Sequence, residues 1–424
     1  MTSDAPTQAY VWAWLPGATD PVVAGQITEQ GDTIQFNYGR SYLERENAIA
    51  LYLPELPLEP GLLPLPGGLS MPSSIRDAAP DAWGRRVILN RTFGKKGPEL
   101  DRKELSELIF LLESGSDRIG ALDFQESPTD YIPRQSQNAT LEELIDSAKR
   151  VEAGIPLTPE LDQALHHGSS IGGARPKALI ESDDKKYIAK FSASNDLYSV
   201  VKAEFIAMRL AALAGLNVAP VSMTKASGKD VLLIERFDRI KAVAGWHRKI
   251  MVSALTLFGL DEMMARYASY EDLAQIIRVR FDQPKASLHE LFARLVFNIL
   301  CGNTDDHARN HAAFWDGQSL TLTPAYDICP QGRTGREASQ AMLIAGDKRA
   351  SLLQTCLSNA HHFLLKEKDA VVIVQSQLQV IRENWDLVCE EAELTEVDKN
   401  LFWGRQFLNP FAFEGAPGKL TSKA

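Results

Sequence analysis

The order of patterns in the middle of the chain restricts the possible fold more than any other feature of the sequence. Strands alternate apolar and polar residues, whereas amphipathic helices repeat an apolar residue every three to four positions. By this rule the sequence predicts a glycine-rich loop, two strands, a long helix and two more strands, at residues 167–174, 177–181, 186–191, 196–214, 221–225 and 230–237. This order of elements favours the α+β class.

The segment before this middle part begins with strand patterns. Residues 10–53 alternate as half-buried strands do, and a stretch rich in proline and glycine follows. The pattern then becomes helical over 81–112. Beyond a polar boundary segment, Thr140 followed by Glu143 predicts the capped start of a short helix over 141–151.

The segment after the middle part has almost only helical patterns. One apolar face is especially regular and ends at Gly302; it consists of Leu288, Leu291, Phe292, Leu295, Val296 and Ile299. Two loops with many polar residues interrupt this half, at 302–311 and 323–330. We therefore expect three domains: an N-terminal α+β subdomain over 1–135, a strand-rich domain over 136–240, and an all-helical domain over 241–424.

Composition excludes several classes of protein. Hydrophobic residues make up 45% and charged residues 24% of the 424 residues, as in a soluble globular chain. The net charge, 45 − 55 = −10, argues against binding nucleic acid over the whole surface. Four widely spaced cysteines indicate reduced thiols, and no apolar run approaches the ~20 residues of a membrane helix. We expect a cytoplasmic protein without membrane contact.

Residues suited to phosphoryl transfer occur in a consistent order along the chain. Transfer of a phosphoryl group from a nucleotide needs backbone N–H groups that approach the phosphates, and a lysine that a carboxylate holds beside them. It also needs an Asp that orients the acceptor hydroxyl, and ligands for the metal ions. The sequence supplies Gly172-Gly173, Lys190, Glu204, Asp305 with Asn310, and Asp327, in that order. The spacing from Asp305 to Asn310 matches the catalytic-loop spacing of protein kinases.

Each of these residues also has a simpler structural interpretation. Lys190 would be an edge-strand lysine that keeps the edge soluble, and Glu204 would lie on a solvated helix face. Asp305, Asp306 and His307 would form a polar helix cap, and Asp327 would be a turn aspartate. The order of all five features favours phosphoryl transfer over these separate interpretations.

The sequence resembles the HipA toxin-kinase family at several motifs. Three of them are residues 170–177 (SIGGARPK), 302–310 (GNTDDHARN) and 322–327 (LTPAYD), and residues 75–85 (IRDAAPDAWGR) resemble the N-terminal subdomain of that family. The resemblance implies an atypical bilobal protein-kinase-like fold and a serine/threonine kinase that serves as the toxin of a toxin–antitoxin pair. The implied cofactors are ATP and Mg²⁺.

The resemblance also implies roles for individual residues. Asp305 is at the catalytic-base position, Asn310 and Asp327 are the implied metal ligands, and Ser170 aligns with an autophosphorylated serine whose modification silences the enzyme. Residues 235–237 correspond to a hinge, where backbone groups of Glu235 and Phe237 meet adenine. The implied nucleotide-binding set is Gly172, Gly173, Ala174, Arg175, Pro176, Lys190, Glu235, Arg236, Phe237, His307, Asn310, Tyr326 and Asp327.

Partners follow from the same resemblance. They are a small HipB-like helix-turn-helix antitoxin, operator DNA mainly through that antitoxin, and a protein substrate such as an aminoacyl-tRNA synthetase, glutamate–tRNA ligase being the best-known target. Phosphorylation of such a substrate would stall translation and arrest growth. The chain departs from the family at Arg175, where Gln is more usual, and at Ser169, a second hydroxyl beside Ser170.

Three other functions use part of the same residues. A small-molecule phosphotransferase would need the same Lys, Asp and Asn set. A mainly non-catalytic co-repressor acting with its antitoxin would leave the intact catalytic set unexplained. A metal-dependent phosphohydrolase built on Asp305, Asp306 and His307 would leave the glycine loop and Lys190 unexplained.

Overall fold

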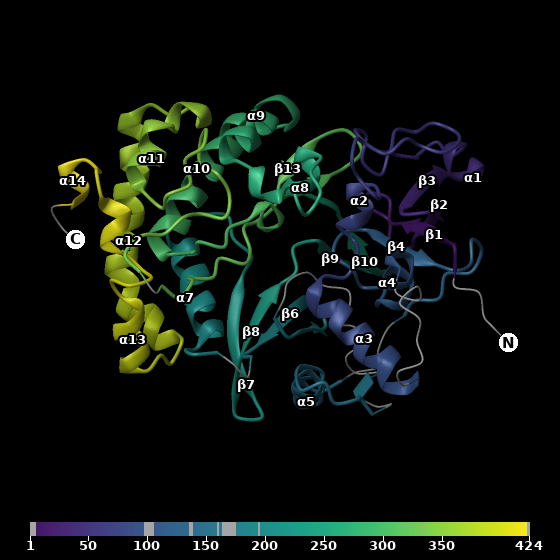
Figure 1. Cartoon of the computed structure of the whole chain (residues 1–424), viewed down its shortest axis with the longest axis horizontal. Coiled ribbons are helices and arrows are strands. Elements are labelled where there is room, and N and C mark those ends of the chain that lie inside the picture. Colours follow the sequence, from purple (N-terminus) through teal and green to yellow (C-terminus); the bar gives the residue numbers. More distant parts are fainter. Residues whose placement is uncertain are drawn as a thin grey trace. The chain divides into compact units, whose positions relative to one another are not determined.

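The computed structural model of the chain describes residues 6–96, 106–134, 139–158, 161–162, 175–193, 196–333 and 335–421 (Figure 1). The chain forms two compact units. The first unit comprises Met1–Asn195, Thr224–Val252 and Phe314–Gln318, and the second comprises Asp196–Met223, Ser253–Ala313 and Ser319–Ala424. Each unit therefore contains segments that are distant in the sequence. The expected division into domains 1–135, 136–240 and 241–424 stays a prediction.

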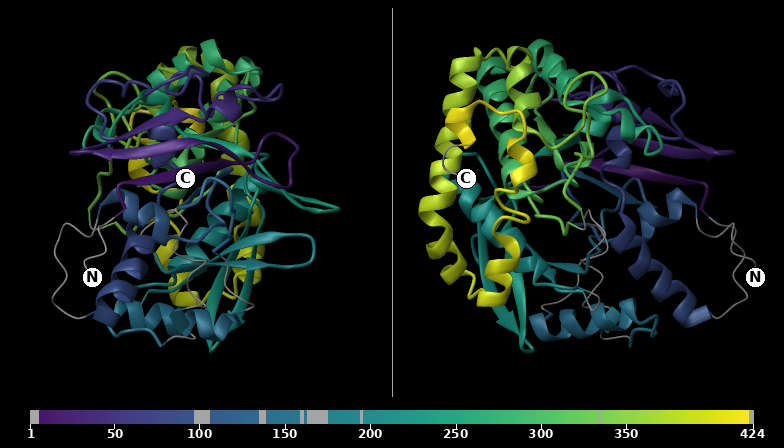
Figure 2. Two further views of the ribbon diagram at one scale, coloured as in Figure 1. Left: turned by 90° about the vertical axis from the view of Figure 1, so that its right-hand side faces the viewer. Right: turned by 60° about the vertical axis from the view of Figure 1, so that its left-hand side comes forward.

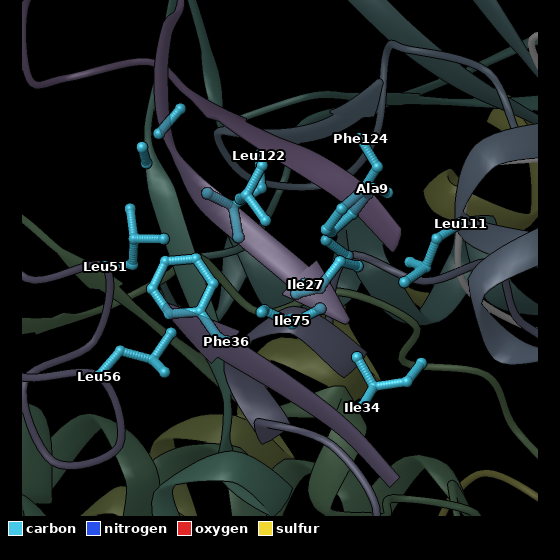
Figure 3. Close-up of a cluster of buried hydrophobic side chains, with 14 of the residues drawn as sticks. Ala9, Ile27, Ile34, Phe36, Leu51, Leu56, Ile75, Leu111, Leu122 and Phe124 are labelled. Atoms are coloured by element: carbon cyan, nitrogen blue, oxygen red, sulfur yellow. The ribbon is translucent and has the colours of Figure 1, made fainter. Parts of the chain in front are cut away.

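An antiparallel sheet forms the N-terminal part of the first unit. Its strands are β1 (Gln8–Ala13), β2 (Val22–Gln30), β3 (Thr33–Tyr38) and β4 (Leu122–Gln125), in the order β3-β2-β1-β4. Along β3 every second side chain is buried, because successive strand residues point to opposite faces. The buried face carries a core that includes Ile27, Phe36 and Phe124 (Figure 3). The strand patterns predicted within residues 10–53 are confirmed as far as Tyr38, whereas residues 40–43 form a short helix and the rest of the range forms turns.

Four helices accompany this sheet. They are α1 (Arg40–Leu43), α2 (Ser73–Arg76), α3 (Ala82–Lys96) and α4 (Glu107–Glu113). Ile75 of α2 and Leu111 of α4 enter the same core as the sheet (Figure 3). Helices α3 and α4 bear out the helical pattern at 81–112.

A second antiparallel sheet contains the strands expected in the middle of the chain. These are β5 (Lys177–Glu181), β6 (Lys186–Phe191), β7 (Val221–Ala226) and β8 (Lys229–Glu235), in the order β5-β6-β8-β7. The turn between β7 and β8 has positive φ at Ser227 (48°) and Gly228 (71°), which suits the twist of a tight hairpin. The predicted strands and hairpin are confirmed.

One face of the second sheet is covered by helices of the same unit. Helix α5 (Leu141–Glu152) begins with a capping box in which Thr140 and Glu143 satisfy each other's backbone N–H groups. Its apolar side shares a core with Trp83 of α3 and with Ala178 and Ala189 of the sheet. The predicted capped helix is confirmed. A further hairpin follows the sheet, formed by β9 (Arg239–Ala242) and β10 (Gly245–Arg248).

The second unit is mainly helical. Its helices are α7 (Val200–Leu213), α8 (Ala254–Phe258), α9 (Tyr270–Arg280), α10 (Pro284–Cys301), α11 (Leu353–Ser358), α12 (Glu367–Glu391), α13 (Glu396–Phe402) and α14 (Gly418–Thr421). Short 3₁₀ turns lie at Ala265–Tyr267, Ala308–Asn310, Ala360–Phe363 and Pro410–Phe413. The long helix α12 packs on α7, α10 and α11 (Figure 2). The apolar face predicted for residues 288–299 is buried in α10.

The region beyond residue 241 departs from the sequence prediction in one respect. We expected helices alone, but β11 (Ile250–Ser253), β12 (Ala312–Trp315) and β13 (Leu320–Leu322) form a three-stranded sheet, in addition to β10. Apolar runs of three or four residues show no periodicity, so pattern alone does not separate them from helix. The described residues include no helix long and apolar enough to cross a membrane.

Candidate active site

The loop after α10 leaves that helix in a fixed direction. Gly302 ends α10 with φ of 73°, and a Cβ atom added there would lie 2.5 Å from the carbonyl oxygen of Gln406. Only glycine accepts both the left-handed backbone and this close approach. The next residue, Asn303, is buried and donates from its Nδ2 atom to Oδ1 of Asn298 at 3.1 Å. The loop containing Asp305 therefore starts from a rigid base.

Two neighbouring aspartates of this loop have opposite environments. The Asp306 side chain is buried, accepts a hydrogen bond from the Tyr270 hydroxyl and lies 3.0 Å from Nε2 of His311. Asp305, in contrast, is exposed. Asp306 is thus an internal support of the loop, whereas Asp305 can reach a substrate. A phosphohydrolase centre formed jointly by Asp305, Asp306 and His307 does not fit this arrangement.

A second loop, residues 323–331, is joined to the first by main-chain and side-chain hydrogen bonds. The Tyr326 hydroxyl donates to the carbonyl oxygen of Arg309 at 2.7 Å, and the Gln331 N–H donates to that of Gly302 at 3.0 Å. Thr323 begins the loop and donates both its N–H and its hydroxyl to the carbonyl oxygen of Ala312. These bonds hold the loop that carries Asp327 against the loop that carries Asp305.

The carboxyl groups of Asp305 and Asp327 influence each other. The pKa of the Asp305 carboxyl lies above its ordinary value, and partial burial is the largest cause. The charge of His307 opposes this rise, and the negative charge of Asp327 adds to it. Asp327 itself has φ of 58°, a left-handed conformation that Asp tolerates better than most residues. The Asn310 side chain donates to the Asp305 carbonyl oxygen at 3.2 Å. This bond holds Asn310 next to Asp305.

These three residues fit a magnesium ion by their chemistry. Mg²⁺ prefers carboxylate and carbonyl oxygens and usually keeps several waters, so that one or two protein ligands suffice. The Asp327 carboxylate and the Asn310 side-chain oxygen are such ligands. A cation there would also relieve the repulsion between Asp305 and Asp327. Among the described residues, no group of three or more His, Cys, Asp or Glu side chains is placed to hold a metal ion.

The lysine and glutamate expected to assist the phosphates are both buried. Lys190 lies on β6, an interior strand of its sheet, and has 8% of its surface exposed; Glu204 in α7 has 1%. The edge-strand interpretation of Lys190 and the solvated-face interpretation of Glu204 are therefore wrong. Buried charges need partners or strong functional reasons. The pairing of Lys190 with Glu204 stays a prediction.

The expected hinge lies where β8 ends. The N–H of Arg236 donates to the carbonyl oxygen of Lys186 at 2.8 Å and so faces β6. In the trans peptide between Glu235 and Arg236 the C=O and N–H point in opposite directions, so the carbonyl oxygen of Glu235 faces away from β6. Phe237 lies in the turn that follows β8. The Arg236 side chain is buried in ion pairs with Asp117 and Asp238. The Arg236 side chain is thus engaged within the protein, and the hinge role of Glu235 and Phe237 stays a prediction.

The remaining predicted residues divide into two groups. Ser169, Ser170, Gly172, Gly173 and Ala174 lie outside the described residues. Pro176 is buried and its carbonyl oxygen accepts the N–H of Phe191 at 3.0 Å, and Arg175 and His307 are half-buried. The sequence interpretation missed Tyr270 and His311, which support the loop through Asp306. Neither carries a local signal, because their role depends on contacts between distant segments.

Two family models match the chain. One, described as the HipA-like C-terminal domain, matches residues 169–385, which is about half of the chain. The other, described as the HipA N-terminal domain, matches residues 18–125. The chain belongs to the HipA family. The resemblance inferred from the motifs is confirmed.

Curated relatives extend over different parts of this HipA-family chain. Y4mE of Sinorhizobium fredii is 27% identical over 338 residues, which cover 73% of this chain and 75% of that protein. The serine/threonine-protein kinase toxin HipA of Shewanella oneidensis is 28% identical over 187 residues, which cover 38% of this chain and 42% of that protein.

A solved structure agrees with the fold as a whole. A chain of the Shewanella oneidensis complex of HipA, HipB and operator DNA matches with a TM-score of 0.64 and 18% identity, covering 95% of this chain and 99% of that chain. At this identity the match establishes the fold alone. The α+β fold of HipA type expected from the sequence is confirmed.

Proposed function

We propose that this HipA-family chain is a serine/threonine protein kinase that transfers the γ-phosphoryl group of ATP, with Mg²⁺, to a protein. The main support for this proposal is that hydrogen bonds join the loops 302–311 and 323–331 of the second unit. Asp305, Asn310 and Asp327 of these loops interact with one another. The family membership and the kinase name of the Shewanella oneidensis relative support it. The nucleotide-binding set named from the sequence is part of the same proposal.

The chemistry assigns a separate task to each residue. The acceptor hydroxyl oxygen forms a bond to the γ-phosphorus, the bond from that phosphorus to the β–γ bridging oxygen breaks, and ADP leaves. Asp305 orients the hydroxyl and accepts its proton. Asn310 and Asp327 would hold the metal, which supplies positive charge to the phosphates. Lys190 would contact the phosphate oxygens, and Glu235 and Phe237 would meet adenine.

The biological setting is proposed on the same basis. The chain would act in the cytoplasm as the toxin of a toxin–antitoxin pair, with a HipB-like helix-turn-helix antitoxin and operator DNA reached mainly through it. A solved relative is in a complex with HipB and operator DNA. The substrate would be a translation protein such as an aminoacyl-tRNA synthetase, glutamate–tRNA ligase being the first to test, and its phosphorylation would arrest growth. Autophosphorylation at Ser170 would end the activity.

Label transfer from γ-labelled ATP tests the activity. The purified chain is incubated with Mg–ATP, with and without candidate protein substrates. Asp305→Asn should lower transfer by on the order of 10² or more, because base and positioning roles are lost together. Asp347→Asn, at an exposed position, makes the same charge change and should leave transfer unaltered.

Three results would contradict the proposal. Near-normal transfer by a folded Asp305→Asn variant would remove Asp305 from the catalytic role. Label found only on small-molecule acceptors would favour a small-molecule phosphotransferase. A folded wild-type chain that binds antitoxin but transfers nothing would favour a non-catalytic co-repressor.

A further inference from the structure

A buried ionic cluster joins the loop before β4 to the hinge in the first unit. The carboxylate of Asp117 has 3% exposure and accepts hydrogen bonds from Nη1 of Arg236 at 3.1 Å and from Nε and Nη2 of Arg239 at 3.0 and 2.9 Å. It also pairs with Nζ of Lys186 at 2.7 Å. One carboxylate from the N-terminal segment therefore contacts three cations beside the end of β8.

Backbone groups of the same loop complete the contact. The Gly120 N–H donates to Oδ2 of Asp238 at 2.8 Å, and the Gly120 carbonyl oxygen accepts from Nη1 of Arg239 at 2.8 Å. The Arg118 carbonyl oxygen accepts from Nη2 of Arg236 at 2.7 Å. Residues 117–120 thus bind residues 236–239 through both side chains and main chain.

The cluster reaches the main-chain atoms that orient the hinge. Lys186 accepts the Arg236 N–H with its carbonyl oxygen and donates to Asp117 with its side chain. Asp117, Lys186 and Arg236 therefore form a closed ring of contacts. Because this ring fixes the direction of the Arg236 N–H, it also fixes the direction of the Glu235 carbonyl oxygen, which belongs to the same peptide.

Stability alone is a poor explanation for so many buried charges. Burying ions costs desolvation, and replacing a buried ionic cluster by well-packed apolar residues is often neutral or stabilising. Burial raises the pKa of Asp117, yet Arg236, Arg239 and Lys186 together hold it well below its ordinary value, so the carboxylate stays charged. A charged anchor with fixed hydrogen-bond directions specifies geometry better than apolar contact does.

We propose that Asp117 is a positioning residue for adenine. Through Asp117, the N-terminal segment, which lies outside the β5-β6-β8-β7 sheet in sequence, sets the orientation of the hinge at 235–237. This inference rests on the proposed nucleotide binding. It assigns to residues 117–120 a role in ATP affinity and in the preference for adenine. The phosphates, which other residues hold, should be bound independently of Asp117.

Asp117→Asn is the direct test, and Glu55→Gln is its matched control. Glu55 is also a buried carboxylate of the N-terminal segment, but it accepts the N–H of Ser74 at 2.9 Å. Binding of Mg–ATP and of Mg–tripolyphosphate, which lacks adenine, is measured by calorimetry on the full chain. Asp117→Asn should weaken Mg–ATP binding by about tenfold, the effect of misaligned hinge hydrogen bonds, without changing tripolyphosphate binding. Glu55→Gln should change neither.

The outcomes separate this inference from the proposed function. A wild-type chain that binds no Mg–ATP would contradict both. If the wild-type chain binds Mg–ATP, unchanged affinity in folded Asp117→Asn, or an equal loss of affinity in Glu55→Gln, would contradict the positioning role alone. If Asp117→Asn does not fold, Lys186→Met opens the same ring with Asp117 still paired to both arginines. It should weaken ATP binding in the same direction, and unchanged affinity would overturn the inference.

Discussion

The hydroxyl of Tyr326 donates a 2.7 Å hydrogen bond to the main-chain carbonyl oxygen of Arg309. Together with the bond from the Gln331 N–H to the Gly302 carbonyl oxygen, it joins the loop that carries Asp327 to the loop that carries Asp305 and Asn310. The sequence motif containing Tyr326 suggested a nucleotide contact, whereas the hydroxyl is used between the loops. Its role in the structure is to hold the candidate metal ligands at a fixed separation.

Tyr326→Phe tests this role. The variant keeps the aromatic ring and removes the hydroxyl that bonds to Arg309, so kcat should fall about fivefold, corresponding to about 1 kcal/mol for one hydrogen bond. Mg–ATP affinity should change less than kcat. Steady-state transfer kinetics measure both quantities, and Tyr267→Phe, on an exposed turn, is the control. Unchanged kcat would show that other contacts position the loops without Tyr326.

Asp327→Asn tests the metal site without disturbing the backbone. Asn tolerates the left-handed conformation at this position, whereas Ala would add strain. Loss of the charged hard ligand should weaken Mg²⁺-dependent ATP binding on the order of tenfold or more. Calorimetric titration of Mg–ATP measures the effect. Affinity equal to that of the wild type would mean that another residue holds the metal.

The ionic cluster around Asp238 should make stability depend on pH. Burial alone would raise the pKa of Asp238. The positive charges of Arg236 and Arg239 outweigh this effect and lower the pKa to about 2. Since the folded pKa lies below the unfolded value of about 3.9, the stabilisation is complete above about pH 4 and is lost as pH falls toward 2. It should amount to on the order of 2 kcal/mol.

Denaturant unfolding of wild type and Asp238→Asn across this pH range checks the prediction. The difference in unfolding free energy should be constant above about pH 4 and shrink below it. Asp347→Asn, which is exposed, should show a small difference at every pH. A difference for Asp238→Asn that persists unchanged at pH 2 would show that its carboxylate charge does not stabilise the fold.

Ser170 lies outside the described residues, and its autophosphorylation stays a prediction. A phosphate of about −1.5 to −2 charge in a loop that must face ATP phosphates would repel the nucleotide. Arg175, which is half-buried, and Lys177, which is buried and lies 3.7 Å from Asp81, are the cations near Ser170 in the sequence that could pair with the phosphate. Mass spectrometry after incubation with Mg–ATP should locate phosphate on Ser170, and the modified chain should bind ATP poorly.

Ser170→Ala and Ser169→Ala distinguish the two neighbouring hydroxyls. Only Ser170→Ala should prevent the modification and prolong activity. Phosphate confined to Ser169, or full ATP affinity of the Ser170-modified chain, would contradict this mechanism.

Much of the fold could be predicted because its signals are local. The capping box at Thr140 and Glu143, the hairpin turn at Ser227-Gly228 and the apolar face of α10 depend only on neighbouring residues. The strands β12 and β13 could not be predicted in this way. Their apolar runs are too short to show a period, and only pairing with distant strands makes them a sheet.

The residues that carry the chemistry, and their order from Lys190 through Asp305 and Asn310 to Asp327, can be taken from the sequence. How each of them is used depends on the folded chain. Asp305 and Asp306 are adjacent and chemically identical, yet one is exposed and the other is buried against Tyr270 and His311. Arg236 looked like a hinge residue, but its side chain belongs to a cluster with Asp117, 119 positions away. Burial and long-range ion pairing depend on which segments pack together, and a local pattern does not contain that information.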